Sequence, residues 1–140
     1  MRYYDLAAAN ERLAVVRPLL VALRLDRDSV AKEQQEIARL EAIHDHGAGI
    51  VAELDQREAA VRDAVTRMHA VVAQLVDWDV TVRDITSGLI DFPALANGRP
   101  VWLCWRLGEG EIAWWHATDE GFSARKLLSE LTGGAAGPLS

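Results

Sequence analysis

The sequence predicts an α+β domain, in which a long antiparallel α-helical hairpin precedes a three- to four-stranded antiparallel β-meander and a short C-terminal helix. Two observations lead to this prediction. Apolar residues recur at seven-residue spacing up to residue 76, interrupted by a glycine-containing turn. After Trp78 the apolar period falls to two, and glycine-containing turns separate the apolar runs. A helical period followed by a strand period is typical of segregated helices and sheet.

The first helix is expected to begin after Asp5, whose side chain is a good N-cap. Its apolar seam includes residues at seven-residue spacing: Ala9, Val16, Leu23, Val30 and Ile37. Pro18 lies inside this pattern and removes one backbone hydrogen bond. Because the apolar period continues across Pro18, we favour one helix that is kinked there. A break into two helices near Asp26–Asp28 is the alternative that stays open.

The second helix is expected from about Ile50 to Val76, after a turn at HDHGAG, residues 44–49. Glycine can adopt the left-handed conformation that ends a helix. Two long helices joined by a short turn predict an antiparallel hairpin over about residues 5–77. Its apolar seams are longer than a small sheet can cover. We therefore expect the hairpin to pair with a second copy of the chain as a homodimer.

The sheet is expected over about residues 80–117. The predicted strands are Thr81–Ile85, Leu89–Pro93, Val101–Leu107 and Ile112–Ala117. Asn97-Gly98 and the GEG segment at 108–110 are the turn signals between the last three. In the C-terminal segment, 118–131, Ser123 is expected to cap a helix through Leu131. The whole of 1–131 is predicted to be a single domain, and the glycine-rich tail 132–140 to be disordered.

Centring the turns on Asn97-Gly98 and Glu109-Gly110 gives a predicted register. The face toward the helices then carries two rows of side chains: Ile90 beside Trp105 and Trp114, and Phe92 beside Leu103 and His116. The opposite face mixes polar, apolar and aromatic side chains: Leu89, Asp91, Trp102, Cys104, Arg106 and Trp115. A slip of one residue in either turn would move a whole strand to the other face.

Two interpretations of this mixed face stay open. In one, the C-terminal segment folds over it and Asp91 pairs with Arg106. In the other, the face binds a protein partner, because aromatic and arginine side chains are enriched at interface centres. The residues of this candidate partner surface are Trp102, Trp115, Arg106 and Arg125.

The candidate ligand or metal site consists of His116, Asp119, Asp91 and Asp84. A histidine with nearby carboxylates can bind a divalent metal ion or act as a general base. On this hypothesis His116 and Asp119 are the metal ligands. The simpler interpretation, which we favour from sequence, is that His116 is partly buried at a strand end and hydrogen-bonded to Asp119. Cys104 is expected to be an inert buried thiol, because the predicted register places no histidine beside it.

Several functional classes are disfavoured. The net charge of −6, without a run of lysine or arginine, argues against nucleic-acid binding. No apolar run approaches the length of a membrane span, and the N-terminus lacks a signal-peptide core, so we expect a cytoplasmic protein without a membrane partner. No phosphate loop, nucleophile elbow or dinucleotide fingerprint appears, which favours a non-enzyme. The one cofactor left to consider is the divalent metal ion of the candidate site.

Three motifs resemble the bacterial and archaeal family called domain of unknown function 2203. They are GLIDFP at 88–93, VWLCWRLGE at 101–109, and WHATDEGF at 115–122 with Arg125. The opening helix is also similar, so the resemblance spans about residues 3–128. The matching positions include Asp84, Asp91, Cys104, Arg106, His116, Asp119 and Arg125. Thr86 departs from the acidic residue common in the family, which weakens any cation-holding role there. Since the family is uncharacterised, the resemblance implies no function.

Two functions are therefore predicted. The first is a non-enzymatic, self-associating interaction or adaptor protein that uses its long helix hairpin. The alternative is a metal- or small-ligand-binding domain, with a hydrolase among the options, whose site lies near His116, Asp119 and Asp91. The first depends on the length of the hairpin, and the second on whether these three side chains converge on one pocket.

Overall fold

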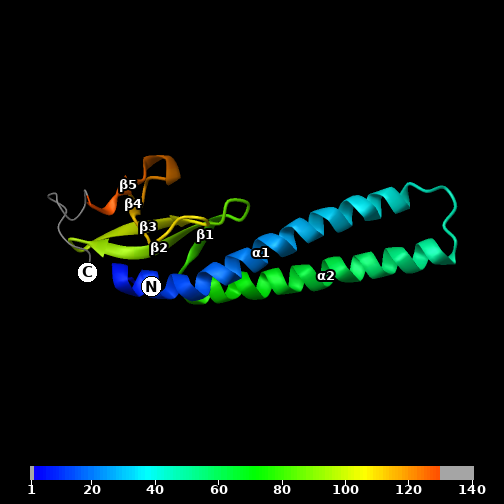
Figure 1. The fold of residues 1–140 in the computed structure, drawn as a ribbon, viewed down its shortest axis with the longest axis horizontal. Coiled ribbons are helices and arrows are strands. Elements are labelled where there is room, and N and C mark those ends of the chain that lie inside the picture. Colours follow the sequence, from blue (N-terminus) through cyan, green and yellow to red (C-terminus); the bar gives the residue numbers. More distant parts are fainter. Residues whose placement is uncertain (1, 130–140) are drawn as a thin grey trace.

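A computed structural model describes residues 2–129 of the 140-residue chain. Two long helices, α1 (Leu6–Glu41) and α2 (Ala48–Asp77), form an antiparallel hairpin (Figure 1). A five-stranded antiparallel sheet follows in the order β1-β2-β3-β4-β5. Its strands are β1 (Thr81–Asp84), β2 (Leu89–Ala96), β3 (Arg99–Arg106), β4 (Trp114–Ala117) and β5 (Lys126–Leu127). The predicted α+β class and the order of its elements are confirmed, with one strand more than expected.

The predicted C-terminal helix is wrong for residues 123–127, and helical structure begins only at Leu128 and Ser129, the last described residues. The chain forms a single 3₁₀ turn at Phe122–Ala124 and then enters β5, where Lys126 pairs with Trp115 and Leu127 with Trp114. The edge of β4 offers backbone donors and acceptors that need partners, and pairing with them competes with helix formation. The end of that predicted helix, 130–131, and the predicted disordered tail, 132–140, lie outside the described residues.

Helix α1 continues through Pro18 without interruption. The Asp5 side chain caps its first turn by accepting a hydrogen bond from Ala8 N at 2.7 Å. The proline ring faces solvent, so the carbonyl of Ala14, which loses its helical partner, can bind water instead. The alternative of two helices broken near Asp26–Asp28 is therefore excluded. At ~1.5 Å per residue, α1 is roughly 54 Å long.

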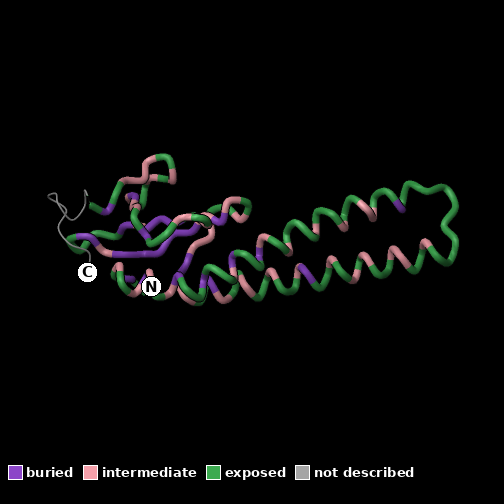
Figure 2. The backbone as a smooth tube through the Cα atoms, in the orientation of Figure 1, coloured by how far each residue is buried: buried purple, intermediate pink, exposed green. Residues whose placement is uncertain are grey.

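The hydrophobic core lies at the end of the molecule that holds the sheet (Figure 2). There one face of the sheet packs on the first half of α1 and the end of α2. The buried side chains include Ala9, Leu13, Val16 and Leu20 from α1, Leu75 from α2, and Ile90, Phe92, Leu103 and Trp105 from the sheet. Tyr4 closes this core from the N-terminal side, with its ring edge against Phe92 and its hydroxyl donating to the Trp78 carbonyl at 2.7 Å.

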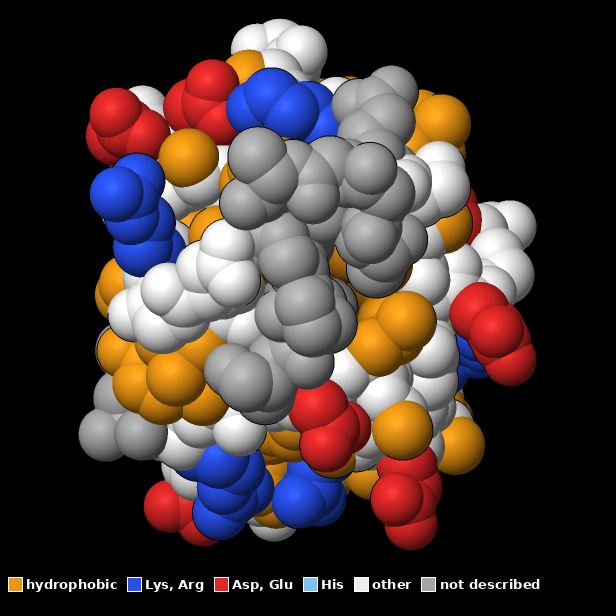
Figure 3. All heavy atoms as spheres, turned by 90° about the vertical axis from the view of Figure 1, so that its left-hand side faces the viewer, with side chains coloured by type: hydrophobic (Ala, Val, Ile, Leu, Met, Phe, Trp, Pro, Cys, Tyr) orange, Lys and Arg blue, Asp and Glu red, His pale blue; other side chains and the backbone are white. Residues whose placement is uncertain are grey.

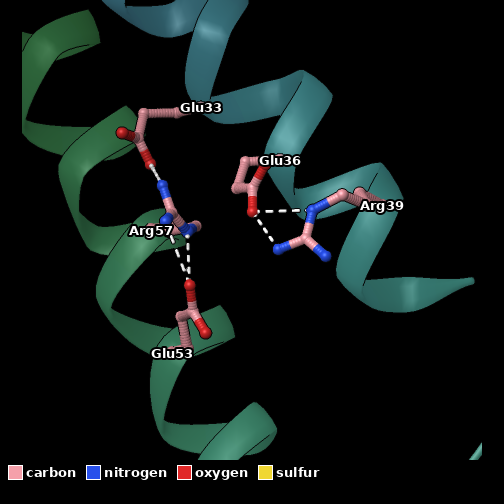
Figure 4. Close-up of polar contacts among 5 residues, drawn as sticks. All are labelled: Glu33, Glu36, Arg39, Glu53 and Arg57. Atoms are coloured by element: carbon pink, nitrogen blue, oxygen red, sulfur yellow. Dashed lines mark hydrogen bonds and ion pairs between the residues drawn. The ribbon is translucent and has the colours of Figure 1, made fainter. Parts of the chain in front are cut away.

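Farther from the sheet, the two helices run on side by side and are mostly exposed (Figure 2). Ion pairs form here both between the two helices and within each helix. Arg57 of α2 reaches Glu33 of α1 at 3.1 Å and Glu53 of its own helix at 3.0 Å, while Arg39 pairs with Glu36 (Figure 4). Exposed ion pairs of this kind contribute about 0–1 kcal/mol each. This part of the hairpin is therefore held by a narrow apolar seam and weak polar contacts.

The predicted register between β2 and β3 is confirmed, with Ile90 opposite Trp105 and Phe92 opposite Leu103. Between β3 and β4 the prediction is wrong by one residue, because Cys104 lies opposite Trp114 and Trp102 opposite His116. The connection is not a two-residue turn: residues 107–113 separate the two strands.

Side-chain hydrogen bonds help to hold this connection. Trp105 Nε1 donates to the Gly110 carbonyl at 2.8 Å, and Ile112 N donates to Asn10 Oδ1 of α1 at 2.9 Å. The shifted register turns His116 away from the helices, and it places Trp115 against the core.

Seen from the sheet end, the surface mixes hydrophobic side chains with charges of both signs (Figure 3). The described side chains on this side form no extended basic area of the kind that phosphate backbones require. Within residues 2–129, no helix combines the length and apolarity needed to cross a membrane.

Candidate functional site

A pocket of about 190 Å³ lies on the sheet face that points away from the helices. Strands β1 to β4 supply one side of it, and the segment after β4 supplies the other. The lining residues are Arg83, Leu89, Asp91, Cys104, His116, Thr118, Glu120, Gly121 and Phe122. The C-terminal segment thus folds over the mixed face, as one of the two interpretations predicted. Asp91 pairs with Arg83 and His116, however, and not with Arg106.

Three potential metal-ligating side chains meet in this pocket. Asp91 comes from β2, Cys104 from β3 and His116 from β4. Their ligand atoms lie within 4.8 Å of one another, and the residues are 1%, 1% and 3% exposed. Asp91 and Cys104 are direct cross-strand partners, and His116 lies opposite Trp102, two residues before Cys104. Alternate residues of a strand share a face, so the sheet itself brings the three side chains together.

The His116 ring is fixed by hydrogen bonds to both nitrogens. Nδ1 lies 2.9 Å from the Ala117 carbonyl, and Nε2 lies 2.9 Å from Asp91 Oδ2. A carbonyl oxygen only accepts hydrogen bonds, so Nδ1 carries a proton. Nε2 is then the nitrogen that faces the possible ligand atoms of Asp91 and Cys104, and a hydrogen bond joins it to Asp91 Oδ2.

The Asp91 carboxylate has one satisfied oxygen and one unsatisfied oxygen. Oδ2 accepts from Arg83 Nε at 2.7 Å as well as meeting His116. Oδ1 is buried and has no hydrogen-bond partner among the described residues. Buried polar atoms without partners are rare in folded proteins because each costs desolvation free energy. The unsatisfied oxygen therefore marks a position where a bound group would be stabilised.

Cys104 is a buried thiol beside a carboxylate. Burial raises the pKa of Cys104 to about 12, and the negative charge of Asp91 acts in the same direction, while Arg125 opposes them. The side chain is therefore a protonated thiol at neutral pH and a poor nucleophile. A metal ion in the pocket would supply the positive charge that a thiolate needs there.

The remaining predicted site residues lie elsewhere. Asp119 is exposed and does not belong to the donor cluster. Asp84 is exposed and stabilises the turn before β2. It accepts hydrogen bonds from Ser87 Oγ at 2.6 Å and from Ser87 N at 3.2 Å, and these bonds lower the pKa of Asp84. The structure thus brings His116 to Asp91, leaves out Asp119 and Asp84, and adds Cys104. The expected hydrogen bond from His116 to Asp119 is replaced by those to Asp91 and Ala117.

Cys104 was missed because the predicted register put His116 on the other face of the sheet. The sequence shows that Cys104 lies two residues from Trp102 on the same strand. The residue of β4 that lies beside Cys104 depends on the connection between β3 and β4, whose shape the sequence does not reveal. The alternation along β2 and β3 alone would have paired Cys104 with Asp91.

The four residues of the candidate partner surface do not share one face. Trp102 lies on the pocket face beneath the Arg83 guanidinium, 4.9 Å from it, whereas Trp115 packs against the core. Arg125 makes two hydrogen bonds to Glu109, and its guanidinium lies 4.4 Å from the Trp114 ring and 4.3 Å from the Phe122 ring. Arg106 remains exposed, 5.3 Å from the Phe122 ring.

Comparison with known proteins gives the family of this chain. No curated protein and no solved structure matches it. The family model described as an uncharacterized conserved protein (DUF2203) matches residues 2–128, a span that contains the helix hairpin, the sheet and every residue of the pocket. The chain is therefore a member of the DUF2203 family of uncharacterised conserved proteins.

Proposed function

We propose that this domain binds a divalent transition-metal ion through Asp91, Cys104 and His116. The observation that supports the proposal is the convergence of three buried donors within 4.8 Å, beside a buried carboxylate oxygen that lacks a hydrogen-bond partner in the described chain. The pocket thus combines a set of ligand atoms with a buried carboxylate oxygen, Asp91 Oδ1, that lacks a hydrogen-bond partner.

The donor types favour zinc among the common ions. Imidazole nitrogen, thiolate sulfur and carboxylate oxygen are the ligands that zinc takes in proteins. Magnesium and calcium prefer sites made of oxygen atoms, so a site with Cys104 and His116 disfavours them. The hydrogen bond from His116 Nδ1 to the Ala117 carbonyl is also the outer contact that usually orients a metal-bound histidine.

Binding would require two protons to leave. Cys104 must become a thiolate, and His116 Nε2 must give up the proton that it shares with Asp91 before its lone pair can reach the ion. Metal binding should therefore release protons and replace the His116–Asp91 hydrogen bond by two metal bonds. Arg83 can keep its hydrogen bond to Asp91 Oδ2 while Oδ1 binds the ion.

The test is zinc titration by isothermal calorimetry on metal-free protein, with elemental analysis of the protein as purified. We expect one ion per chain. The variants Cys104→Ala, His116→Gln and Asp91→Asn should each weaken binding by more than the about 10–100-fold that loss of an outer contact causes. Asp119→Asn is the matched control and should bind as the wild type does.

Two results would contradict the proposal. One is a folded wild-type protein that binds no zinc, cobalt or nickel. The other is binding that survives Cys104→Ala and is lost in Asp119→Asn, because the ligand set would then be the one expected from the sequence.

A second function, self-association of two copies through the helix hairpin, is favoured by the outward face of α1. Apolar residues there stand at heptad spacing, and all are exposed: Ala7, Ala14, Pro18, Val21 and Leu25. Val21 is 39% exposed and Leu25 is 62% exposed. A strip of exposed apolar residues on a long helix favours pairing with another helix. A dimer formed in this way would be a scaffold or adaptor.

Light scattering at micromolar concentration tests the second function. The expected mass is that of a dimer for the wild type and of a monomer for the double variant Val21→Glu, Leu25→Glu. Val51→Glu changes an exposed valine of α2 outside this seam and should leave the dimer intact. A monodisperse wild-type monomer would exclude self-association.

A further inference from the structure

We infer that the metal ion keeps one coordination position open toward the pocket, and that this position binds an oxyanion group of a small molecule, held from the side by the guanidinium of Arg83. The inference rests on the proposed metal-binding function. The inference adds the chemical class of the ligand to that function: a small compound that carries a carboxylate or a phosphate.

The count of ligands leaves a position open. Zinc is usually four-coordinate, and sites that only stabilise a fold fill all four positions with protein side chains. The described residues supply three donors here, and no fourth histidine, cysteine or acidic side chain joins their cluster. Glu120 is the other carboxylate that lines the pocket, but it lies outside the donor cluster, and its Oε1 accepts from Ala117 N at 3.1 Å and from Lys126 Nζ at 2.8 Å.

The pocket is larger than an ion requires. A cavity needs about 10–15 Å³ to hold a single water molecule, whereas this pocket has about 190 Å³. Leu89 and Phe122 supply apolar walls, and Thr118 supplies a hydroxyl group. The remaining space therefore suits a compound of several heavy atoms with a short carbon skeleton.

The charge of the loaded site favours an anion. The carboxylate of Asp91 and the thiolate of Cys104 would neutralise a divalent ion. Glu120 and Lys126 neutralise each other as an ion pair. The guanidinium of Arg83, which lines the pocket, then adds a positive charge that no other lining residue balances.

Arg83 is also placed to bind such an anion. Its Nε is fixed by Asp91 Oδ2 at 2.7 Å, and its guanidinium carbon lies over the Trp102 ring at 4.9 Å. These contacts orient the guanidinium plane and leave the Nη groups as further donors. A guanidinium of fixed orientation is well suited to carboxylate and phosphate oxygens. An oxyanion could therefore coordinate the ion with one oxygen and accept from Arg83 with another.

Cobalt-loaded protein allows the two claims to be tested separately. Calorimetry with cobalt(II) first establishes whether the ion binds. Sodium acetate and inorganic phosphate are then titrated separately while the visible absorption of the bound cobalt is recorded. We expect a saturable spectral change with at least one of them, and the more effective anion identifies a carboxylate or a phosphate ligand. Arg83→Gln removes an outer contact of Asp91, so it should bind cobalt about 10–100-fold more weakly. Titrated at cobalt concentrations that saturate the site, it should also weaken anion binding by about tenfold or more, the loss expected of one charge-assisted hydrogen bond.

Arg99→Gln is the matched control, because it removes the same charge from an exposed position of β3 outside the pocket. It should leave anion binding unchanged. Cobalt binding without any spectral response to either anion would overturn this inference and leave the metal site intact. An equal response in the wild type and Arg83→Gln would overturn the role of Arg83. Absence of cobalt binding would remove the proposed function and the inference with it.

Discussion

His116 Nε2 and Asp91 Oδ2 lie 2.9 Å apart, in side chains that are 3% and 1% exposed. The two residues are 25 positions apart in the chain, and they come from β4 and β2, on either side of β3. This contact ties the outer strands of the pocket together across the strand between them. It exists only because the register of β4 places His116 on the face away from the helices.

The first prediction concerns this contact in metal-free protein. His116→Ala leaves the buried Asp91 carboxylate without its imidazole partner. Removal of one member of a buried charged pair typically costs about 3–5 kcal/mol, so we expect a loss of about 3 kcal/mol in the free energy of unfolding, measured by urea denaturation in EDTA. Asp119→Asn, at an exposed position, should stay within about 0.5 kcal/mol of the wild type. A loss below about 1 kcal/mol for His116→Ala would mean that Arg83 alone satisfies Asp91.

The second prediction concerns Gly88, the residue just before β2. Its φ is +69°, and a Cβ atom there would lie 2.6 Å from Leu107 Cβ. Gly98 has a similar φ of +74° but nothing within 4 Å, so Gly98→Ala should cost only the left-handed strain of about 1–2 kcal/mol. Gly88→Ala should cost distinctly more, and Gly110→Ala, with neither feature, close to nothing. Equal urea midpoints for Gly88→Ala and Gly98→Ala would show that Leu107 moves aside freely.

The third prediction concerns the ion pair of Glu109 and Arg125, at 2.8 Å. Burial acts to raise the pKa of Glu109. Hydrogen bonds from Arg125 and from the Arg106 backbone, together with the charges of both arginines, outweigh this effect. The pKa of Glu109 therefore lies below its ordinary value of 4.5. Ionised Glu109 therefore stabilises the fold fully above the unfolded-state pKa of 4.5. This contribution is lost as the pH falls below 4.5 and through the folded-state pKa.

Thermal melting between pH 7 and pH 3 checks the direction of this pH dependence. Glu109→Gln should lower the Tm at pH 7, and the difference from the wild type should shrink as the pH falls through the acid range. Glu111→Gln, at an exposed neighbouring position, is the control and should leave the profile unchanged. A Tm difference that stays constant with pH would contradict the assignment of the stabilisation to the ionised carboxylate.

The fourth prediction concerns Pro18. Because α1 continues across this exposed position, alanine there would restore one helical hydrogen bond and remove the clash of the proline ring. Proline is about 3 kcal/mol less favourable than alanine in a helix interior, so Pro18→Ala should stabilise the domain by about 1–3 kcal/mol. Ala22→Gly, one helical turn later and also exposed, should destabilise it by about 1 kcal/mol. A lower Tm for Pro18→Ala would contradict this expectation.

The parts of the fold that sequence predicted are those set by local patterns. The seven-residue period and the Asp5 cap define the helices without reference to other elements. Asn97 and Gly98 both have positive φ, 53° and 74°, as a two-residue hairpin turn requires, and this fixed the register of β2 and β3. In contrast, β5 has two residues, too few to show any period.

The candidate site was only partly predictable because it depends on contacts between distant residues. Asp91 and His116 were chosen as chemically suitable side chains, and the structure places them in contact. Cys104 needed the register of β4, which follows a connection that is hydrogen-bonded to α1 through Ile112 and Asn10, 102 residues apart. Asp119 was close to His116 in sequence, but it lies in the exposed segment after the strand.

The length of the connection between β3 and β4 therefore determines which residues of β4 face the pocket. Residues 107–113 determine which of Trp115 and His116 faces the pocket. Deleting one residue from this connection, with the strand ends otherwise held, would put Ala117 in the place of His116 opposite Trp102 and turn the histidine toward the apolar core. Relatives can be sorted by this criterion: a chain that keeps the aspartate, cysteine and histidine but differs by one residue between these strands should lack the site.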